Sequence, residues 1–271
     1  MDYFTCPEKK PVLSLENVSY SYHTLSGETK ALDHLSFQIY PGEFVAIVGP
    51  SGCGKSTLLN LLAGLLKNQS GELLFHHEDL YKTVHQAKIP RIGYMLQHDH
   101  LFGWRTIWEN VTLGLELNDM MTPANLENVS ALLEKYGLDE FRNKKPSQLS
   151  GGMRQRAALI RTLSLNPEVL LLDEPFSALD YQTRLLVSSD IGKIIRENKI
   201  TALLVTHNLS EAISLADRIL VLTRRPASLK SQMEISLTIT DASPLGYRSA
   251  PEFSEYFNEL WEDLWDEKGI G

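Results

Sequence analysis

A glycine-rich loop near residue 50 constrains the fold of this chain more than any other feature of its 271-residue sequence. Residues 49–56 read Gly-Pro-Ser-Gly-Cys-Gly-Lys-Ser, which fits the pattern GxxxxGK[ST]. The loop follows a continuous apolar run, Phe44–Val48, and precedes a leucine-rich segment, Ser56–Leu66, so a buried strand and a helix should flank it. In that setting backbone N–H groups and the positive end of the helix favour phosphate. The pattern therefore predicts an α/β fold that binds a nucleotide.

The side chains of this loop have separate predicted roles. Lys55 should reach the terminal phosphates, the Ser56 hydroxyl can ligate Mg²⁺, and Thr57 extends the polar edge of the loop. Cys53 is expected to be a small packed side chain without a chemical role. The candidate nucleotide-binding residues of the loop are Gly49, Pro50, Ser51, Gly52, Cys53, Gly54, Lys55, Ser56 and Thr57.

Two adjacent carboxylates follow a second apolar run. Val169–Leu172 reads as a buried strand, and Asp173 and Glu174 come directly after it. Ligands of open α/β sheets bind at the carboxyl ends of the strands. Asp173 is therefore predicted to hold Mg²⁺, directly or through water. Glu174 is predicted to orient or deprotonate the attacking water, because phosphoryl transfer depends mainly on positioning and charge stabilisation.

The chain begins with strand-like segments and continues into a helical region. Val12–Tyr22 and Leu35–Ile39 alternate in polarity, which predicts antiparallel strands, with His23–Lys30 as a loop between them. From Thr106 to Leu163 the apolar period is helical, which predicts a helical lobe at about 98–163.

Strand-like runs resume beyond this lobe. Ala202–Val205 and Ile219–Leu222 are separated by helical stretches, the alternation typical of a mostly parallel sheet covered on both faces. We therefore predict one domain at 12–230 with the lobe inserted, and a tail at 231–271. An amphipathic helix is expected at about 252–267, packed on its own domain or against a partner subunit.

Composition excludes several classes of protein. The formal net charge is −8 and Lys and Arg do not cluster, so nucleic acid is not an expected partner. The two cysteines, Cys6 and Cys53, form neither a disulfide framework nor a metal-binding spacing, which favours a reducing cytosol. No secretory signal is expected in Met1–Pro11, and Leu58–Leu66 is too short to span a bilayer. A GTPase is disfavoured because Asn143–Pro146 begins like the guanine-reading NKxD motif but ends in proline.

A second motif narrows the class of nucleotide-binding protein. Leu149–Arg156 reads Leu-Ser-Gly-Gly-Met-Arg-Gln-Arg, in which Ser150 is a good N-cap and Gly151 and Gly152 allow close approach of a backbone to an anion. This stretch resembles the LSGGQ signature of the ATP-binding cassette (ABC) family, with Met153 in place of glutamine. The motif thus indicates a second phosphate-binding position.

The other motifs of that family follow in order. Gln97 resembles the Q-loop residue, Ser177–Asp180 the D-loop, and His207 the switch histidine, while Tyr22 resembles the aromatic residue that stacks on adenine. The resemblance covers roughly Val12–Arg225. It implies a P-loop NTPase core of the ABC type that hydrolyses ATP with Mg²⁺.

The resemblance also implies how the residues work. Two copies would form an ATP-dependent head-to-tail homodimer, in which Ser150, Gly151 and Gly152 of one copy cover the nucleotide of the other. Within one copy, Glu174 would be the catalytic base and His207 would contact the γ-phosphate. Asp180 would link the two sites and Gln97 would relay the nucleotide state to the helical lobe. The implied magnesium ligands are Ser56, Gln97 and Asp173.

A transport role follows from the same family. Leu101–Val111 and Arg224–Ala227 resemble segments of the ATPases that serve nitrate, sulfonate and taurine importers, with Gly103 where proline is usual. This implies an importer subunit at the cytoplasmic face of the cell membrane, acting through separate permease subunits and indirectly with a solute-binding protein. The alternative is a soluble ABC ATPase acting on nucleic acid or ribosomes. Such proteins usually carry a coiled-coil insertion, a second cassette or a basic surface, none of which is visible in this sequence.

Overall fold

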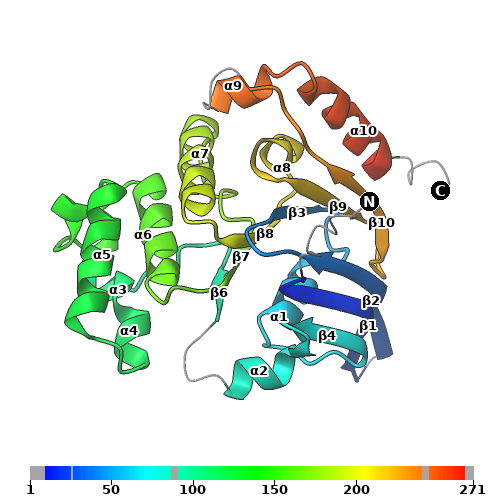
Figure 1. Cartoon of the computed structure of the whole chain (residues 1–271), viewed down its shortest axis with the longest axis horizontal. Helices are drawn as coiled ribbons and strands as arrows, with labels where there is room; N and C mark the ends of the chain where they lie inside the picture. The colour runs from blue at the N-terminus through cyan, green and yellow to red at the C-terminus, as the bar shows by residue number, and fades with distance from the viewer. Residues whose placement is uncertain (1–9, 26, 87–90, 240–243, 266–271) are drawn as a thin grey trace, which may run out of the picture.

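The computed structural model describes residues 10–25, 27–86, 91–239 and 244–265 of the chain. It contains an antiparallel sheet and a mostly parallel sheet, with a lobe of helices α3–α6 beside the parallel sheet, on the side away from the antiparallel one (Figure 1). The predicted α/β fold, with an N-terminal antiparallel sheet and an inserted helical lobe, is confirmed.

The antiparallel sheet has the strand order β2-β1-β4-β5. Its strands are β1 (Leu13–Thr24), β2 (Gly27–Ile39), β4 (Ser70–Phe75) and β5 (Glu78–Asp79). Strands β1 and β2 stay paired up to Thr24 and Gly27, which lie opposite each other. The predicted loop at His23–Lys30 is therefore wrong. The side chains at 27–30 are exposed, and this part of the hairpin therefore lacks the apolar alternation by which a strand is predicted.

The larger sheet has the order β10-β9-β3-β8-β7-β6. Its strands are β3 (Phe44–Val48), β6 (Ile92–Met95), β7 (Val169–Asp173), β8 (Thr201–Val205), β9 (Arg218–Leu222) and β10 (Leu229–Glu234). Strands β9, β3, β8, β7 and β6 are parallel, and β10 is an antiparallel edge strand. Strand β10 was not predicted, because exposed and half-buried residues alternate along it and none is fully buried.

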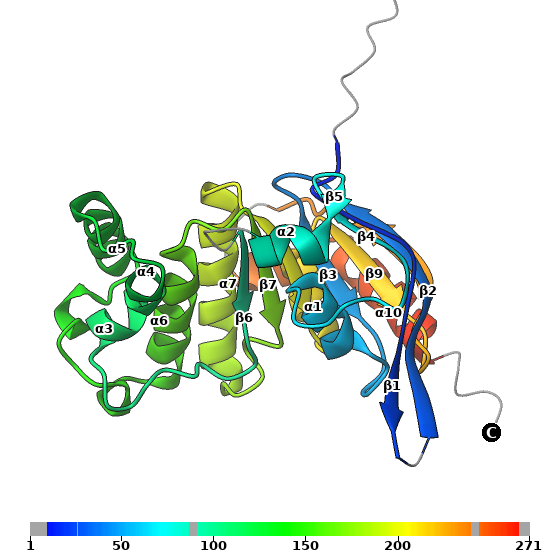
Figure 2. The same cartoon turned by 90° about the horizontal axis from the view of Figure 1, so that it is seen from below.

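Helices cover both faces of this sheet. They are α1 (Lys55–Leu62), α2 (Leu80–Gln86), α3 (Ile107–Val111), α4 (Leu113–Leu117), α5 (Pro123–Lys135), α6 (Gly151–Leu163), α7 (Tyr181–Glu197), α8 (Leu209–Leu215), α9 (Pro244–Arg248) and α10 (Phe253–Trp265), with 3-10 turns at Asp139–Phe141 and Pro146–Gln148. Helix α1 lies between the two sheets (Figure 2), and its leucines are buried in a cluster with residues of both sheets. Helix α7 lies between the sheet and the helical lobe in both views, and α6 packs against it.

The C-terminal helix α10 packs on the chain's own domain. Leu260 is fully buried in a cluster with α8 and strands β3 and β9, while Trp261 is half exposed. Own-domain packing was one of the two predicted alternatives. The predicted end of this helix, beyond Trp265, lies outside the described residues. Among the described helices, none is both long enough and apolar enough to cross a membrane.

Candidate nucleotide-binding and hydrolysis site

The glycine-rich loop connects β3 to α1 through backbone conformations that suit glycine. Gly52 has φ +73° and Gly54 has φ +133°, values that an L side chain rarely adopts. A Cβ atom at Gly54 would lie 2.8 Å from the carbonyl oxygen of Ala31. Gly54 is also the N-cap of α1 and no side chain caps this helix, so its first backbone N–H groups are available to phosphate oxygens.

The Lys55 ammonium lies inside the curve of the loop. Its side chain is buried, and Nζ donates hydrogen bonds to the carbonyl oxygens of Gly49 at 2.8 Å and Pro50 at 2.9 Å. A buried charge requires such polar partners. Cys53 is also buried, and its sulfur lies 3.9 Å from Nζ of Lys55. The cysteine is therefore a packed side chain inside the loop.

Tyr22 lies beside the start of α1. Its hydroxyl is 3.2 Å from the Thr57 hydroxyl, and the edge of its ring meets the ring of Tyr20 at a centroid distance of 5.1 Å. The side chain is 39% exposed, so an aromatic surface stands open next to the phosphate loop. Stacking of Tyr22 on adenine remains a prediction.

Asp173 ends β7, and its carboxylate lies close enough to the Ser56 hydroxyl for that hydroxyl to affect the pKa of Asp173. Burial raises the pKa of the Asp173 carboxyl, and the neighbouring charge of Glu174 adds to this, while hydrogen bonds from Tyr94 and Ser56 act in the opposite direction. The Tyr94 hydroxyl lies 3.3 Å from Oδ2 of Asp173, and burial together with the Asp173 charge raises the pKa of Tyr94. The Ser56 hydroxyl and the Asp173 carboxylate are thus neighbouring oxygen donors, a pair that suits Mg²⁺.

Glu174 and His207 are in direct contact. Nδ1 of His207 lies 3.0 Å from Oε2 of Glu174, and the two residues follow the adjacent strands β7 and β8. Glu174 has φ +43°, in the left-handed region, and its backbone N–H donates to the carbonyl oxygen of Val205 at 2.9 Å. A glutamate in this conformation is uncommon and is a feature often found at functional sites.

Gln97 is linked to this cluster through Ser177, and Asp180 lies farther along the same segment after Glu174. The Gln97 amide Nε2 donates to the Ser177 hydroxyl at 3.3 Å, and that hydroxyl donates to the carbonyl oxygen of Glu174 at 2.9 Å. Asp180 is the N-cap of α7 and accepts from the backbone N–H of Thr183 at 3.1 Å. The relay role of Gln97 and the linking role of Asp180 stay predictions.

The signature segment is presented differently. Ser150 is the predicted N-cap of α6, accepting from the backbone N–H of Met153 at 3.3 Å, and its side chain is exposed. Gly152 is buried against α7, where a Cβ atom would come within 2.8 Å of Val187 and 3.0 Å of Thr183. Close packing of two helices is therefore a reason for glycine at this position in addition to the predicted approach of an anion.

Two residues near the loop were missed from the sequence. Tyr94 precedes the end of β6, and its role as a partner of Asp173 depends on the pairing of β6 with β7, which the sequence does not state. Arg225 donates from Nε at 3.1 Å and Nη2 at 2.8 Å to the carbonyl oxygen of Gly52. The only sequence signal for Arg225 was the resemblance of residues 224–227 to a segment of importer ATPases.

Comparison with known proteins agrees with this geometry. The family model described as ABC transporter matches residues 32–177. An uncharacterized ABC transporter ATP-binding protein of Bacillus subtilis, YtlC, is 40% identical over 93% of this chain and 95% of its own length. The aliphatic sulfonates import ATP-binding protein SsuB of Bacillus thuringiensis is 37% identical over 83% of this chain and 87% of its own.

A solved structure supports the same assignment. The ATP-binding cassette MJ0796, in a dimeric post-hydrolysis state bound to ADP and Pi, superposes with a TM-score of 0.70 at 30% identity, over 83% of this chain and 99% of that one. The family model covers more than half of the chain, and the relatives align with it along most of its length. The chain therefore belongs to the ABC transporter ATP-binding proteins and is an ATP-hydrolysing subunit of that family.

Proposed function

We propose that this chain powers an importer of a small solute of the nitrate, sulfonate or taurine class, through separate permease subunits at the cytoplasmic face of the membrane. The observation that carries the ATPase part is the Glu174–His207 contact at 3.0 Å beside the phosphate loop. The import direction and solute class are supported by the similarity to SsuB and by the Leu101–Val111 segment.

We assign the hydrolytic roles as follows. Lys55 and the loop N–H groups hold the β- and γ-phosphates, and Tyr22 stacks on the adenine. Glu174 orients and deprotonates the attacking water, while His207 contacts the γ-phosphate from the adjacent strand end. The contact between Glu174 and His207 supports this division, since phosphoryl transfer is catalysed mainly by positioning and charge stabilisation.

Mg²⁺ fits the donor set of this site. The Ser56 hydroxyl and the Asp173 carboxylate are neighbouring oxygen donors, and we propose that they hold the ion with the Gln97 amide oxygen. When bound, the ion would neutralise charge on the β- and γ-phosphates. Partial burial of Asp173 also suits a cation, because a nearby positive charge favours the ionised form of a carboxyl group that burial disfavours.

We further propose a head-to-tail homodimer. Ser150 is exposed at the N-terminus of α6, so it can be offered to a nucleotide bound by a second copy. Gly151 and Gly152 would approach the same nucleotide through their backbone, and Asp180 would link the two sites. The dimeric state of the similar cassette MJ0796 supports this arrangement.

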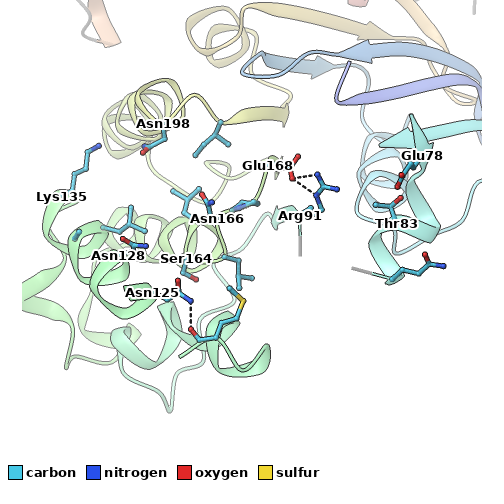
Figure 3. A pocket seen from close by; sticks show the side chains of 18 of the residues that line it. Glu78, Thr83, Arg91, Asn125, Asn128, Lys135, Ser164, Asn166, Glu168 and Asn198 are labelled. Atoms are coloured by element: carbon cyan, nitrogen blue, oxygen red, sulfur yellow. Dashed lines mark hydrogen bonds and ion pairs between the residues drawn. The ribbon is translucent and has the colours of Figure 1, made fainter. Parts of the chain in front are cut away.

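A groove between the helical lobe and the segment of β5 and α2 is the proposed docking place of the permease. It has a volume of about 1390 Å³, and Figure 3 shows Asn125, Asn128 and Lys135 of the helical lobe on one side and Glu78 and Thr83 on the other. A permease segment bound here would contact the helical lobe and the β5–α2 segment at once. It could therefore transmit a movement of one relative to the other. We propose that residues 12–230 form the nucleotide-binding domain around this groove and that residues 231–271 form a tail.

Affinity purification from solubilised membranes tests this function. The tagged full-length chain should retain a multi-spanning permease, identified by mass spectrometry. Ala131→Arg should abolish that retention. Ala131 is exposed in the groove lining, so the larger, charged arginine side chain would occupy the space proposed for the permease. Glu134→Arg, exposed on the same helix but outside the groove lining, is the matched control and should leave retention unchanged.

The outcomes separate the two candidate functions. A permease, together with a solute-binding protein encoded with it or bound to it, would support import and supply a solute to test. Retention of ribosomal proteins or nucleic acid with no membrane protein would overturn the proposal in favour of a soluble ABC ATPase. Retention that survives Ala131→Arg would place the permease on another surface.

A further inference from the structure

We propose that Arg184 and Glu211 are positioning residues that join the D-loop to the segment carrying His207, so that the two move as a unit. Arg184 lies on α7 directly after the D-loop, and Glu211 lies on α8 directly after the His207 segment. The inference rests on the proposed catalytic roles of Glu174 and His207, and it adds two side chains that no motif in the chain identifies.

Glu211 holds the residues on both sides of His207. Its carboxylate accepts from the Thr206 hydroxyl at 2.8 Å and from the Asn208 amide at 3.2 Å. Asn208 also donates its backbone N–H to the Thr206 hydroxyl at 3.0 Å and accepts from the backbone N–H of Glu211 at 3.3 Å. The backbone of His207 is therefore fixed from both neighbours, and the imidazole can point to Glu174 without a large entropic cost.

Arg184 holds the D-loop in the same way. Its Nη2 donates to the carbonyl oxygens of Ser177 at 3.2 Å and Leu179 at 2.9 Å. Its buried Nε has no hydrogen-bond partner among the described residues and forms an ion pair with Oε1 of Glu211 at 3.9 Å. Both charged side chains are largely buried, with 24% of the Arg184 side chain and 8% of the Glu211 side chain exposed. Ions taken out of water at this depth are costly unless they are paired and hydrogen-bonded, so each constrains the other.

These contacts close a ring around the proposed catalytic pair. From Glu174 the path runs through Ser177 to Arg184, from Arg184 to Glu211, and from Glu211 through Thr206 and Asn208 to His207, which returns to Glu174 at 3.0 Å. Burial raises the pKa of Glu211, whereas Thr206, Arg184, His207 and Arg248 lower it, in agreement with a carboxylate that depends on its neighbours. A shift of the D-loop would therefore change the position of His207 through Arg184 and Glu211, two side chains outside the proposed nucleotide contacts.

The arrangement predicts an effect on turnover and not on nucleotide affinity. Arg184→Ala or Glu211→Ala should lower kcat about 10- to 100-fold, the usual cost of removing a group that orients a catalytic residue. The dissociation constant of ATP should stay within about twofold, because neither residue contacts the phosphate loop. Arg184→Lys and Glu211→Gln, which keep the charge or the shape, should give intermediate kcat values and guard against misfolding of the alanine variants.

A matched control lies on the same two elements. Arg196 of α7 donates to the Asp217 carboxylate and to the carbonyl oxygen of Leu215, both at 2.9 Å, at the end of α7 away from the D-loop. Arg196→Ala removes a comparable arginine without touching the ring and should leave kcat unchanged. An equal loss of kcat in Arg196→Ala and Arg184→Ala would mean that the loss comes from weakened packing of α7 on α8. That result would overturn the inference.

A double variant decides whether Glu211 acts through His207. We expect His207→Ala with Glu211→Ala to be no slower than His207→Ala alone, because an effect carried by the imidazole is lost with it. A further multiplicative loss would show that Glu211 acts elsewhere and would overturn the inference. If His207→Ala and Glu174→Gln themselves keep normal turnover, the proposed catalytic roles fail; if they are slow while Arg184→Ala and Glu211→Gln are normal, only this inference fails.

Discussion

The phosphate loop and the signature segment both contain glycines at the N-terminus of a helix, yet they lie in different environments. At the loop, Lys55 is buried and donates to two carbonyl oxygens of the same chain, and Ser56 lies against Asp173. At the signature, Ser150 is exposed, while Gly152 is buried against α7. One helix N-terminus, without a side-chain cap, thus lies among the proposed catalytic side chains, whereas the other is capped by Ser150 and open to solvent.

The difference indicates a division of labour between the two regions. The loop region holds the lysine, the hydroxyl and the carboxylates to which we assign roles in ATP hydrolysis. The signature region holds backbone N–H groups and an N-cap serine, which can stabilise phosphate but cannot activate water. This supports the proposed dimer, in which the exposed helix N-terminus of one copy completes the buried site of the other. Substitutions in the loop region should therefore impair ATP binding or turnover, whereas substitutions at the exposed signature serine should impair dimerisation.

Lys55→Ala should produce the largest effect, a loss of ATP affinity of about 10³-fold. In the proposed role the ammonium makes charge-assisted hydrogen bonds to more than one phosphate, and such bonds are worth about 1.5–3 kcal/mol each. Isothermal titration with ATP measures the change. Undiminished affinity would remove Lys55 from the nucleotide site and would erase the contrast between the two regions.

Glu174→Gln should slow hydrolysis by about 10²-fold or more while ATP still binds. The amide keeps the size of the side chain but cannot accept a proton from water, and a positioned catalytic base is generally worth that much. Turnover and ATP affinity are measured on the same preparation. Near-normal turnover would assign the base to another group.

Ser150→Arg should weaken ATP-dependent dimerisation by about tenfold or more, with monomer stability and ATP affinity unchanged. Ser150 is exposed, so the larger side chain fits the monomer, whereas in the proposed interface it would meet the partner's nucleotide site. Sedimentation with and without ATP follows the effect, best in the Glu174→Gln background where ATP persists. A normal shift on adding ATP would contradict the shared-site arrangement.

Gly152→Ala should lower the stability of the monomer by about 1 kcal/mol. The added methyl would lie 2.8 Å from Val187, and overpacking costs about 1–3 kcal/mol, from which about 1 kcal/mol of improved helix propensity is recovered. Gly151→Ala is the matched control, since its methyl would meet the ends of two flexible side chains, Leu179 at 3.1 Å and Arg154 at 3.9 Å, and should cost less. Equal melting temperatures for the two variants would show that the α6–α7 contact is not tight.

The sequence predicted the loop region more completely than the signature region, for a physical reason. The shape of the loop depends on local backbone conformation at Gly52 and Gly54, and its carboxylates follow a continuous apolar strand, so both signals are local. The packing of Gly152 on α7, the Tyr94–Asp173 contact and the Arg184–Glu211 pair join segments that are 27 to 79 residues apart in the chain. The hairpin beyond Tyr22 was missed because its strands are polar at that end, where hydrogen bonding and not apolar burial holds them.

Arg225→Ala should have the smallest effect, a loss of ATP affinity of about threefold with dimerisation at saturating ATP unchanged. Arg225 donates twice to the carbonyl oxygen of Gly52, and this contact holds a carbonyl of the loop while placing a positive charge beside it. Because the arginine is exposed, solvent reduces its contribution to well below that of Lys55. Arg225→Lys keeps the charge but only one donor direction, so an intermediate affinity would indicate that both matter. Impaired dimerisation at saturating ATP in Arg225→Ala would mean that this contact extends to the partner's signature segment, and the two regions would then be coupled more closely than their environments suggest.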